Sequence, residues 1–292
     1  MIRQYYEAAR ITEVLADLAY RCLKTGQTSI PDHELDRPPL RDLSKILLEA
    51  GILTYGRWHG GFRFSHNLFM EYFAAVWLRY ESDFLTYAKL PSWSGVLVML
   101  ADSSSEKRSE IQQAVLRAMA EDKSASGTSD RGANWAIGEI GDIHAIPQLI
   151  GIYRNSGNGD LLSAIGRIAG RSPDGASQKE MAINVIAEVL LDDLPTSDFD
   201  ALMSSHTLDP IFRMWRAAEA MSEIGNSVAA KHLLSALAKH SEKLTFPLGG
   251  HIRRNFTGYL FHVGNAAVPA LINSLDSNDF TLSLVASEAL FS

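Results

Sequence analysis

The stretch ANWAIGEIGDIHAIPQLIGIY (Ala133–Tyr153) recurs in altered form as AAEAMSEIGNSVAAKHLLSAL (Ala217–Leu237) and GYLFHVGNAAVPALINSL (Gly258–Leu275). In each copy a helical apolar stripe ends at a glycine, an Asp or Asn follows, and a second helix begins. These pairs are Gly141 with Asp142, Gly225 with Asn226, and Gly264 with Asn265. Glycine ends a helix without the steric penalty of a Cβ, and Asp or Asn accepts hydrogen bonds from the next turn. The motif therefore predicts a repeated junction between two helices.

The spacing of the junctions indicates a helical-repeat protein. Gly225 and Gly264 lie roughly 40 residues apart, and Gly141 and Gly225 about twice that, which is the period of two-helix HEAT or armadillo units. A divergent repeat is expected in the longer interval. LLSAIGRIAG (Leu161–Gly170) and MAINVIAEVLL (Met181–Leu191) supply its two helices. Residues 86–292 are therefore predicted to form a HEAT/armadillo-like α-solenoid.

The first part of the chain has a different pattern. Apolar residues at helical spacing predict helices over Ala9–Lys24 and Leu40–Ala50, the second ending at Gly51. Ile52–Phe64 mixes β-branched and aromatic residues around a Gly-Gly pair and predicts a β-hairpin, after which Ser65 is the expected N-cap of a third helix. This order predicts a small winged-helix-like module over residues 1–85, so the fold class is all-α. Four aromatic residues of this segment are interpreted as core: Phe64, Phe69, Tyr72 and Phe73.

Composition limits the possible functions. The 292 residues are 46% hydrophobic and 21% charged, as in an ordinary globular chain. A net charge of -7 argues against a dedicated nucleic-acid binder, which needs clustered Lys and Arg to neutralise phosphates. The single cysteine, Cys22, excludes an intrachain disulfide and fits a reducing compartment. Because the sequence has no long apolar run and no apolar signal core, we expect a cytoplasmic protein with no membrane partner.

Motifs for catalysis and metal binding are missing from the sequence. None of the nine histidines belongs to an H-x-x-x-H or H-E-x-x-H pair, and no G-x-S-x-G nucleophile elbow occurs. Cys22 lies on a predicted amphipathic helix and is interpreted as structural. We therefore expect no enzymatic activity, no metal site and no cofactor held by this chain itself.

One string resembles a known family. FSHNLFMEYFAA (Phe64–Ala75) is similar to the pattern F-x-H-x-x-F-x-E-Y-F-A-A found late in NACHT-family signalling ATPases, and EAGIL (Glu49–Leu53) resembles the short segment before their hairpin. The resemblance covers residues 1–85, and the repeats resemble the sensor or scaffold array that many such proteins carry. It implies that His66 contacts a phosphate of ADP when an ATPase domain is present.

The ATPase core is missing, since the sequence has no G-x-x-x-x-G-K-[ST] loop and no glycine followed by lysine. ADP or ATP would therefore reach this chain only through a separate or missing ATPase domain, docked in cis or in trans. The chain ends in an apolar helix, LVASEALF (Leu284–Phe291), without a polar capping repeat, so we expect a fragment or a continuation onto a partner. The resemblance implies a non-catalytic sensor module in signalling or antiviral defence.

A protein ligand is expected on the helices that end at Gly141, Gly170, Gly225 and Gly264. These are taken as the second helices of the two-helix repeat units, which line the concave face of a solenoid. Trp and Arg combine large contact area with directed hydrogen bonds, so they dominate protein recognition. The candidate partner-binding residues are Trp135, Arg167, Arg213, Trp215, Arg216, Arg253 and Arg254. A basic strip of this kind favours an acidic protein segment or a nucleic-acid backbone.

Two other functions stay open at this point. Nucleic-acid binding would use the winged helix or the repeat groove, as in helical-repeat DNA glycosylases. Its basic candidates are Arg57, His59 and Arg63 on the wing and His251, Arg253 and Arg254 near the last repeat. A stand-alone HEAT-repeat scaffold of the bilin-lyase type is suggested only by the AIGEIGD-type repeat, and an absorbance scan of the purified protein separates it from the others.

Overall fold

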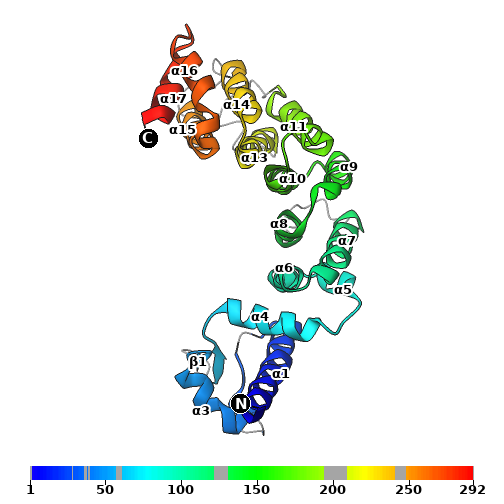
Figure 1. Cartoon of the computed structure of the whole chain (residues 1–292). Helices are drawn as coiled ribbons and strands as arrows, with labels where there is room; N and C mark the ends of the chain where they lie inside the picture. The colour runs from blue at the N-terminus through cyan, green and yellow to red at the C-terminus, as the bar shows by residue number, and fades with distance from the viewer. Residues whose placement is uncertain are drawn as a thin grey trace. The chain divides into compact units, whose positions relative to one another are not determined.

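The computed structural model describes residues 2–27, 29–35, 38, 40–56, 61–121, 131–193, 209–240 and 248–291. The chain divides into two compact units, residues 1–123 and 124–292, and each is described by itself (Figure 1). Helices make up most of the described part, and its one sheet has two strands. The predicted all-α fold class is therefore confirmed.

Unit 1 begins with the predicted order of helices and hairpin. Its first elements are α1 (Ile2–Thr25), α2 (Asp32–Leu35), α3 (Leu40–Glu49), β1 (Leu53–Tyr55), β2 (Phe62–Phe64) and α4 (Asn67–Leu78). The strands are antiparallel, with Leu53 opposite Phe64. Gly51 ends α3 with a left-handed φ of 69°, as a helix C-terminal glycine does. Cys22 is buried, in agreement with a structural role.

Two details of α4 differ from the expectations. The N-cap is His66, whose Nδ1 accepts the N–H of Leu68 at 3.1 Å, whereas the Ser65 hydroxyl donates to the carbonyl of Gly51 and so fixes the hairpin. The predicted core is also only half right. Phe64 and Phe73 are buried, but Phe69 is 40% and Tyr72 51% exposed. Helix α4 packs on α1 and α6, and this packing buries Phe73 but leaves the other two aromatic residues of the helix largely exposed.

Unit 1 continues beyond the predicted module. Its remaining elements are α5 (Phe84–Ala88), η1 (Pro91–Trp93), α6 (Ser94–Ser103) and α7 (Ser105–Glu121). Trp93 is 1% exposed and forms the centre of an aromatic group with Tyr20 and Tyr87. The proposed division near residue 85 stays a prediction, because compactness alone assigns α5 to α7 to the same unit as α1 to α4.

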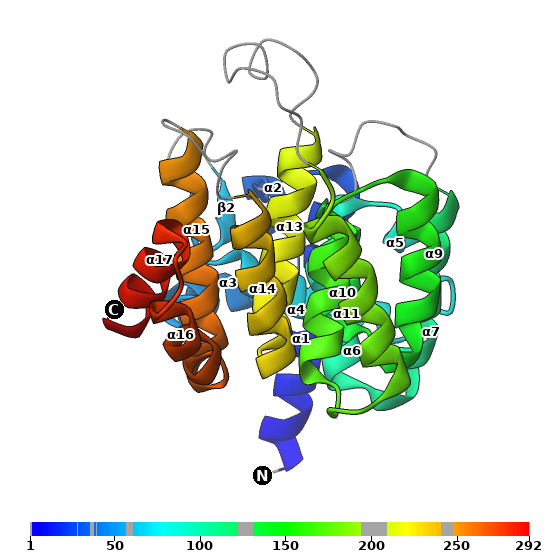
Figure 2. The same ribbon diagram turned by 90° about the horizontal axis from the view of Figure 1, so that it is seen from above.

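Unit 2 is a series of helix pairs arranged in two layers (Figures 1 and 2). Its elements are α8 (Arg131–Ile140), η2 (Ile143–Ala145), α9 (Ile146–Ser156), α10 (Asp160–Arg171), α11 (Ser177–Leu190), α13 (Asp209–Ile224), α14 (Ser227–His240), α15 (Leu248–Val263), η5 (Gly264–Ala266), α16 (Val268–Leu275) and α17 (Phe280–Phe291). Helices α8, α10, α13 and α15 form the inner layer, on the concave side of the arc that unit 2 makes in Figure 1. Helices α9, α11, α14 and α16 form the outer layer, and the whole is solenoid-like.

The predicted junctions are confirmed in part. Gly225 and Gly264 have left-handed φ values of 67° and 66°. Asp142 accepts the N–H of His144 at 2.9 Å, and Asn226 accepts the N–H of Ala229 at 2.9 Å, so both act as N-caps. The same role for Asn265 is wrong, because this residue lies inside the 3-10 turn η5, which has no side-chain cap.

Gly141 and Gly170 differ from the expectation for another reason. Neither has a left-handed φ, and Gly170 lies inside α10 instead of ending it. A Cβ on Gly141 would lie 2.5 Å from both the carbonyl oxygen of Ile137 and Ile168 Cδ1, and one on Gly170 would overlap the carbonyl oxygen of Glu223 on α13. Close packing against a neighbouring helix therefore requires Gly170, and at Gly141 it adds to a clash with the preceding turn.

Candidate functional site

The inner layer of unit 2 carries a pocket of about 180 Å³ formed by three successive inner helices. Trp135 of α8 is 42% exposed at this pocket, although a large apolar side chain is usually covered. The lining residues come from α8, α10 and α13: Asn134, Trp135, Asp160, Ser163, Ala164, Arg167, Arg216 and Glu219. Three of the predicted partner-binding residues, Trp135, Arg167 and Arg216, therefore meet at one place.

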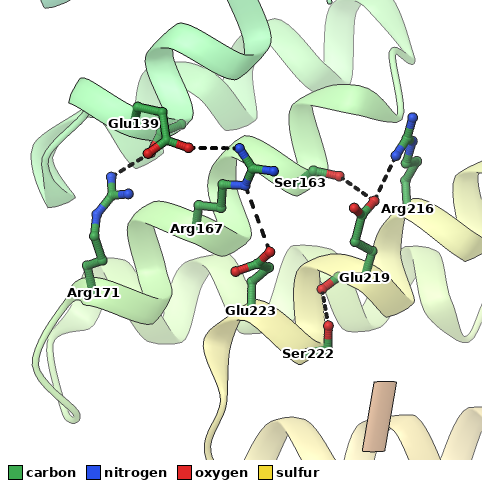
Figure 3. Close-up of polar contacts among 9 residues, drawn as sticks. Glu139, Ser163, Arg167, Arg171, Arg216, Glu219, Ser222 and Glu223 are labelled. Carbon is green, nitrogen blue, oxygen red and sulfur yellow. Dashed lines mark hydrogen bonds and ion pairs between the residues drawn. The ribbon is translucent and has the colours of Figure 1, made fainter. Parts of the chain in front are cut away.

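Arg167 connects the three inner helices (Figure 3). Its Nη1 donates to Oε1 of Glu139 on α8 at 3.0 Å, and its Nε lies 3.9 Å from Oε1 of Glu223 on α13. The Arg167 side chain is 30% exposed, so solvent screens these pairs only in part. Arg167 is thus an ordered part of the inner surface.

Arg216 organises the other side of the pocket. Its Nε lies 2.8 Å from Oδ1 of Asp160, and its Nη1 donates to Oε2 of Glu219 at 2.8 Å. The Ser163 hydroxyl donates to the same Oε2 at 3.0 Å, as Figure 3 shows. In the part of the chain that the structure describes, the other oxygen of Glu219, Oε1, has no hydrogen-bond partner. One carboxylate oxygen at the pocket is therefore available.

Arg171, which the sequence does not predict as a site residue, binds carbonyl groups at the end of α8. Its Nη2 donates to the carbonyl of Gly138 at 2.5 Å and to that of Gly141 at 3.2 Å. These are carbonyl groups that the end of a helix leaves without intrahelical partners. In Figure 3 the Arg171 side chain points toward Glu139. We call these seven charged residues the inner-face cluster: Glu139, Asp160, Arg167, Arg171, Arg216, Glu219 and Glu223.

The inner-face cluster differs in charge from the basic strip that the sequence suggests. Among the described residues it joins four carboxylates to three guanidinium groups, and Glu139 and Asp160 have further interactions, so the cluster is mixed in charge and not basic. The sequence predicts Arg167 and Arg216 as site residues, but neither Arg171 nor any of the four carboxylates. The spacing of Arg216 and Glu219, three apart on one helix, is a signal for their pair. The pairs between helices have no such signal, because they depend on the register of α8, α10 and α13.

The remaining predicted residues do not line the pocket. Trp215 contacts Phe212 edge to face, with ring centroids 5.4 Å apart. Arg253 of α15 lies 4.0 Å from Glu288 of α17, which also accepts the Thr257 hydroxyl at 3.3 Å. Arg213 lies on α13, and Arg254 is exposed on α15. The side chains of Arg57, His59 and His251 lie outside the described residues.

Asn134 is the least exposed polar residue at the pocket. It is 4% exposed, and among the described atoms neither its Nδ2 nor its Oδ1 has a hydrogen-bond partner. A buried amide without partners costs roughly 1 to 3 kcal/mol for each unsatisfied group. Such groups are rare in folded proteins, and a partner molecule is one way of satisfying them.

In unit 1, the two ring nitrogens of His66 differ in their hydrogen bonding. Because Nδ1 accepts the N–H of Leu68, the proton of the neutral ring is on Nε2, which is left as a donor. Burial raises the pKa of Glu71 on the same helix, and the nearby His66 opposes this shift. Glu71 lies against Gly95 of α6, where a Cβ would be 2.6 Å from the carboxylate.

An exposed apolar face of α4 follows His66 in the sequence. Leu68 is 56% exposed, and it is followed by Phe69 and Tyr72, both at least 40% exposed. Tyr72 contacts Phe73 edge to face, which connects this face to the core. Isolated exposed apolar residues are common, but three within two turns form a continuous apolar surface, which in soluble proteins is typical of interaction sites.

The fold and the inner surface define an all-α protein with a solenoid-like second unit. No group of His, Cys, Asp and Glu side chains able to hold a metal ion occurs among the described residues. In the same part of the chain no helix is both long and apolar enough to cross a membrane. Comparison with known proteins finds no matching family model, no matching curated protein and no matching solved structure.

Proposed function

We propose that this chain is a non-catalytic interaction module whose inner layer in unit 2 binds a protein ligand. The observation that carries the proposal is an exposed tryptophan, Trp135, beside charged side chains that neighbouring helices hold in place. Arg167 and Arg216 are ordered by Glu139, Asp160 and Glu219 before any ligand arrives. A preordered surface loses less conformational entropy on binding, and Trp and Arg are the residues on which protein recognition most often depends.

Unit 1, in this proposal, docks onto a NACHT-type ATPase domain in cis or in trans, in the cytoplasm. Support comes from the string FSHNLFMEYFAA, from the exposed face of α4, and from the Nε2 donor of His66. ADP or ATP belongs to the ATPase domain, and His66 adds one hydrogen bond to a phosphate. Binding of the ligand to unit 2 is the input, and the state of the ATPase domain is the output of a signalling or defence response.

The ligand site is tested by comparing two variants of the tagged full chain as bait in a lysate of its native host. Trp135→Ala removes the exposed inner side chain, and Met181→Ala removes a similarly exposed apolar side chain from α11 in the outer layer. We expect a protein that is retained by the wild type and by Met181→Ala but lost with Trp135→Ala. Equal retention by all three baits would place the interface away from the inner layer.

The docking of unit 1 is tested in the same way. The double variant Phe69→Ser/Tyr72→Ser is compared with Tyr80→Ser, which serves as the control because Tyr80 is 84% exposed in the same unit. Only the double variant should lose a protein with a Walker-type loop. In the assembly with that protein, His66→Leu should weaken ADP retention. His66→Asn is the informative control, because Asn keeps the N-cap but has no Nε2 donor. If His66→Asn retains ADP like the wild type, His66 is only an N-cap.

A further inference from the structure

We infer that the inner-face pocket takes a cationic side chain, Arg or Lys, from an extended segment of the protein ligand. The inference rests on the proposed function, and it adds the chemistry of the ligand. It reverses the expectation from the sequence, which is a basic strip that binds an acidic protein segment or a nucleic-acid backbone. The reversal follows from where the carboxylates lie.

The charge of the site is the first argument. Each of the pocket arginines already has a carboxylate within 3.0 Å, so neither needs an anion from outside. The charged side chains that line the pocket itself are two carboxylates, Asp160 and Glu219, and two guanidinium groups, Arg167 and Arg216, so no anion is missing there. Oε1 of Glu219 is the acceptor without a partner among the described atoms, and the side chain of Glu219 is 32% exposed. The site is therefore complementary to a cation that donates hydrogen bonds.

Trp135 gives the second argument. Its side chain is 42% exposed and lines the same pocket as Glu219. A guanidinium or ammonium group is attracted to the face of an indole ring, and the energy grows when the contact is shielded from water. A tryptophan beside an available carboxylate favours a basic residue over an apolar one.

Asn134 shows why the cation belongs to a peptide and not to a free amine. Its Oδ1 needs a donor, which a basic side chain supplies, but its Nδ2 needs an acceptor, which a polyamine lacks. A peptide backbone supplies acceptors and donors next to the side chain. Both atoms of the Asn134 amide are buried, so the contact requires the amide to turn toward the pocket that it lines.

The size of the pocket agrees with one side chain. Its volume of about 180 Å³ is below the roughly 300 to 1,000 Å³ of sites that hold a whole small ligand. The pocket therefore takes a single residue as an anchor, while the rest of the segment lies on the inner layer.

The test is fluorescence anisotropy with two labelled peptides, one of alternating Gly and Arg and one of alternating Gly and Glu, titrated with the full chain. The Gly-Arg peptide should bind, and Glu219→Gln should weaken it about tenfold, as expected for a lost hydrogen bond to a charged group. Trp135→Ala, at an exposed position, should weaken it as well. Unlabelled spermidine at matched charge should compete poorly, since it has no acceptor for Asn134.

A second carboxylate controls for the net charge of the chain. Glu188 lies on α11 in the outer layer, is 71% exposed, and pairs loosely with Arg154 at 4.0 Å. Glu188→Gln removes the same charge and should change binding less than twofold.

Equal effects of Glu188→Gln and Glu219→Gln would overturn the inference, because binding would then follow overall charge. Tighter binding of the Gly-Glu peptide, still dependent on Trp135, would also overturn it while leaving the proposed function in place. A failure of the proposed function is seen in the separate lysate experiment, in which the Trp135→Ala bait would then retain the same proteins as the wild type.

Discussion

Two junctions of unit 2 contain the same tripeptide, Glu-Ile-Gly, and use its glycine differently. Gly225 has a left-handed φ of 67°, and a Cβ there would meet nothing closer than 3.8 Å. Gly141 has an ordinary φ, and a Cβ there would lie 2.5 Å from both the carbonyl oxygen of Ile137 and the Ile168 side chain. The first glycine is required by the left-handed backbone of its own turn, whereas the second is required because the preceding turn and a neighbouring helix together leave no space for a Cβ. Identical sequence at equivalent repeat positions therefore does not imply an identical physical role.

The repeat between them shows the packing role most strongly. Gly170 occupies the glycine position of this copy but stays helical, because α10 needs it for contact with α13. Gly170→Ala should lower the free energy of unfolding by about 3 kcal/mol, since the new methyl group overlaps backbone that cannot move alone. Urea denaturation followed by circular dichroism measures this value.

Gly151→Ala is the matched control for that substitution. Gly151 lies inside α9, is exposed, and has open space where the methyl group would be placed. The same change should therefore raise stability by up to about 1 kcal/mol through helix propensity. If both variants lose stability equally, the cost comes from the residue type and not from the contact of α10 with α13.

Substitution of Gly264 tests whether a left-handed backbone conformation requires the glycine. This residue has a φ of 66°, and no described atom lies within 4 Å of a Cβ built there. Gly264→Val should cost about 1 to 2 kcal/mol, because a β-branched residue is strained in the left-handed region. Gly264→Asn should cost less, since Asn tolerates this conformation. Equal melting midpoints for the Val and Asn variants would mean that φ does not determine the choice of glycine.

Substitution of Asn226 tests the N-cap of α14, which follows Gly225. Oδ1 of Asn226 accepts the N–H of Ala229 at 2.9 Å. Asn226→Ala should lower the free energy of unfolding by about 1 kcal/mol, whereas Asn226→Asp keeps an acceptor and should stay near the wild type. A thermal melt of both variants separates the lost hydrogen bond from any general intolerance of substitution at this position.

The smallest expected effect concerns pH. The hydrogen bond from Lys179, followed by that from Asn226, lowers the pKa of Asp174. A carboxylate with a lowered pKa in the folded state stabilises the fold at neutral pH, and this contribution is lost as the pH falls through the folded-state pKa. Asp174→Asn should therefore melt slightly below the wild type at neutral pH, and the difference should vanish in acid. A difference that grows in acid would contradict the role of this charge.

The sequence predicts those parts of the fold whose causes are local. The caps at Asp142 and Asn226, the hairpin and the helix pairs depend on residues close together in the chain, and all four were predicted. The N-cap of α4 was misplaced by one residue, because Ser is the more usual cap and its hydroxyl instead bonds Gly51. Such competition between a local cap and a hydrogen bond to a residue 14 positions earlier has no signature in the sequence.

The candidate site was only half predictable. Trp135, Arg167 and Arg216 were chosen by residue type, and the structure brings these three together. The partners of the arginines were missed, since Glu139 and Glu223 belong to different copies of the repeat and converge on Arg167 only after the helices stack. Residue type suggested a basic strip, whereas the pairing across helices decides the net charge of the surface.

The glycines of α10 have a mechanical consequence. At Gly166 and Gly170 a Cβ would press on the backbone of Ala220 and Glu223, so two helices meet along their main chains without side chains between them. A solenoid bends by changing the spacing of its helices, and backbone contact leaves little spacing to change. Compliance is therefore low between α10 and α13, the two helices that hold the four pocket-lining charges. Two of the three walls of the pocket are thus kept at a fixed distance, and bending of unit 2 is easier at joints where side chains separate the helices.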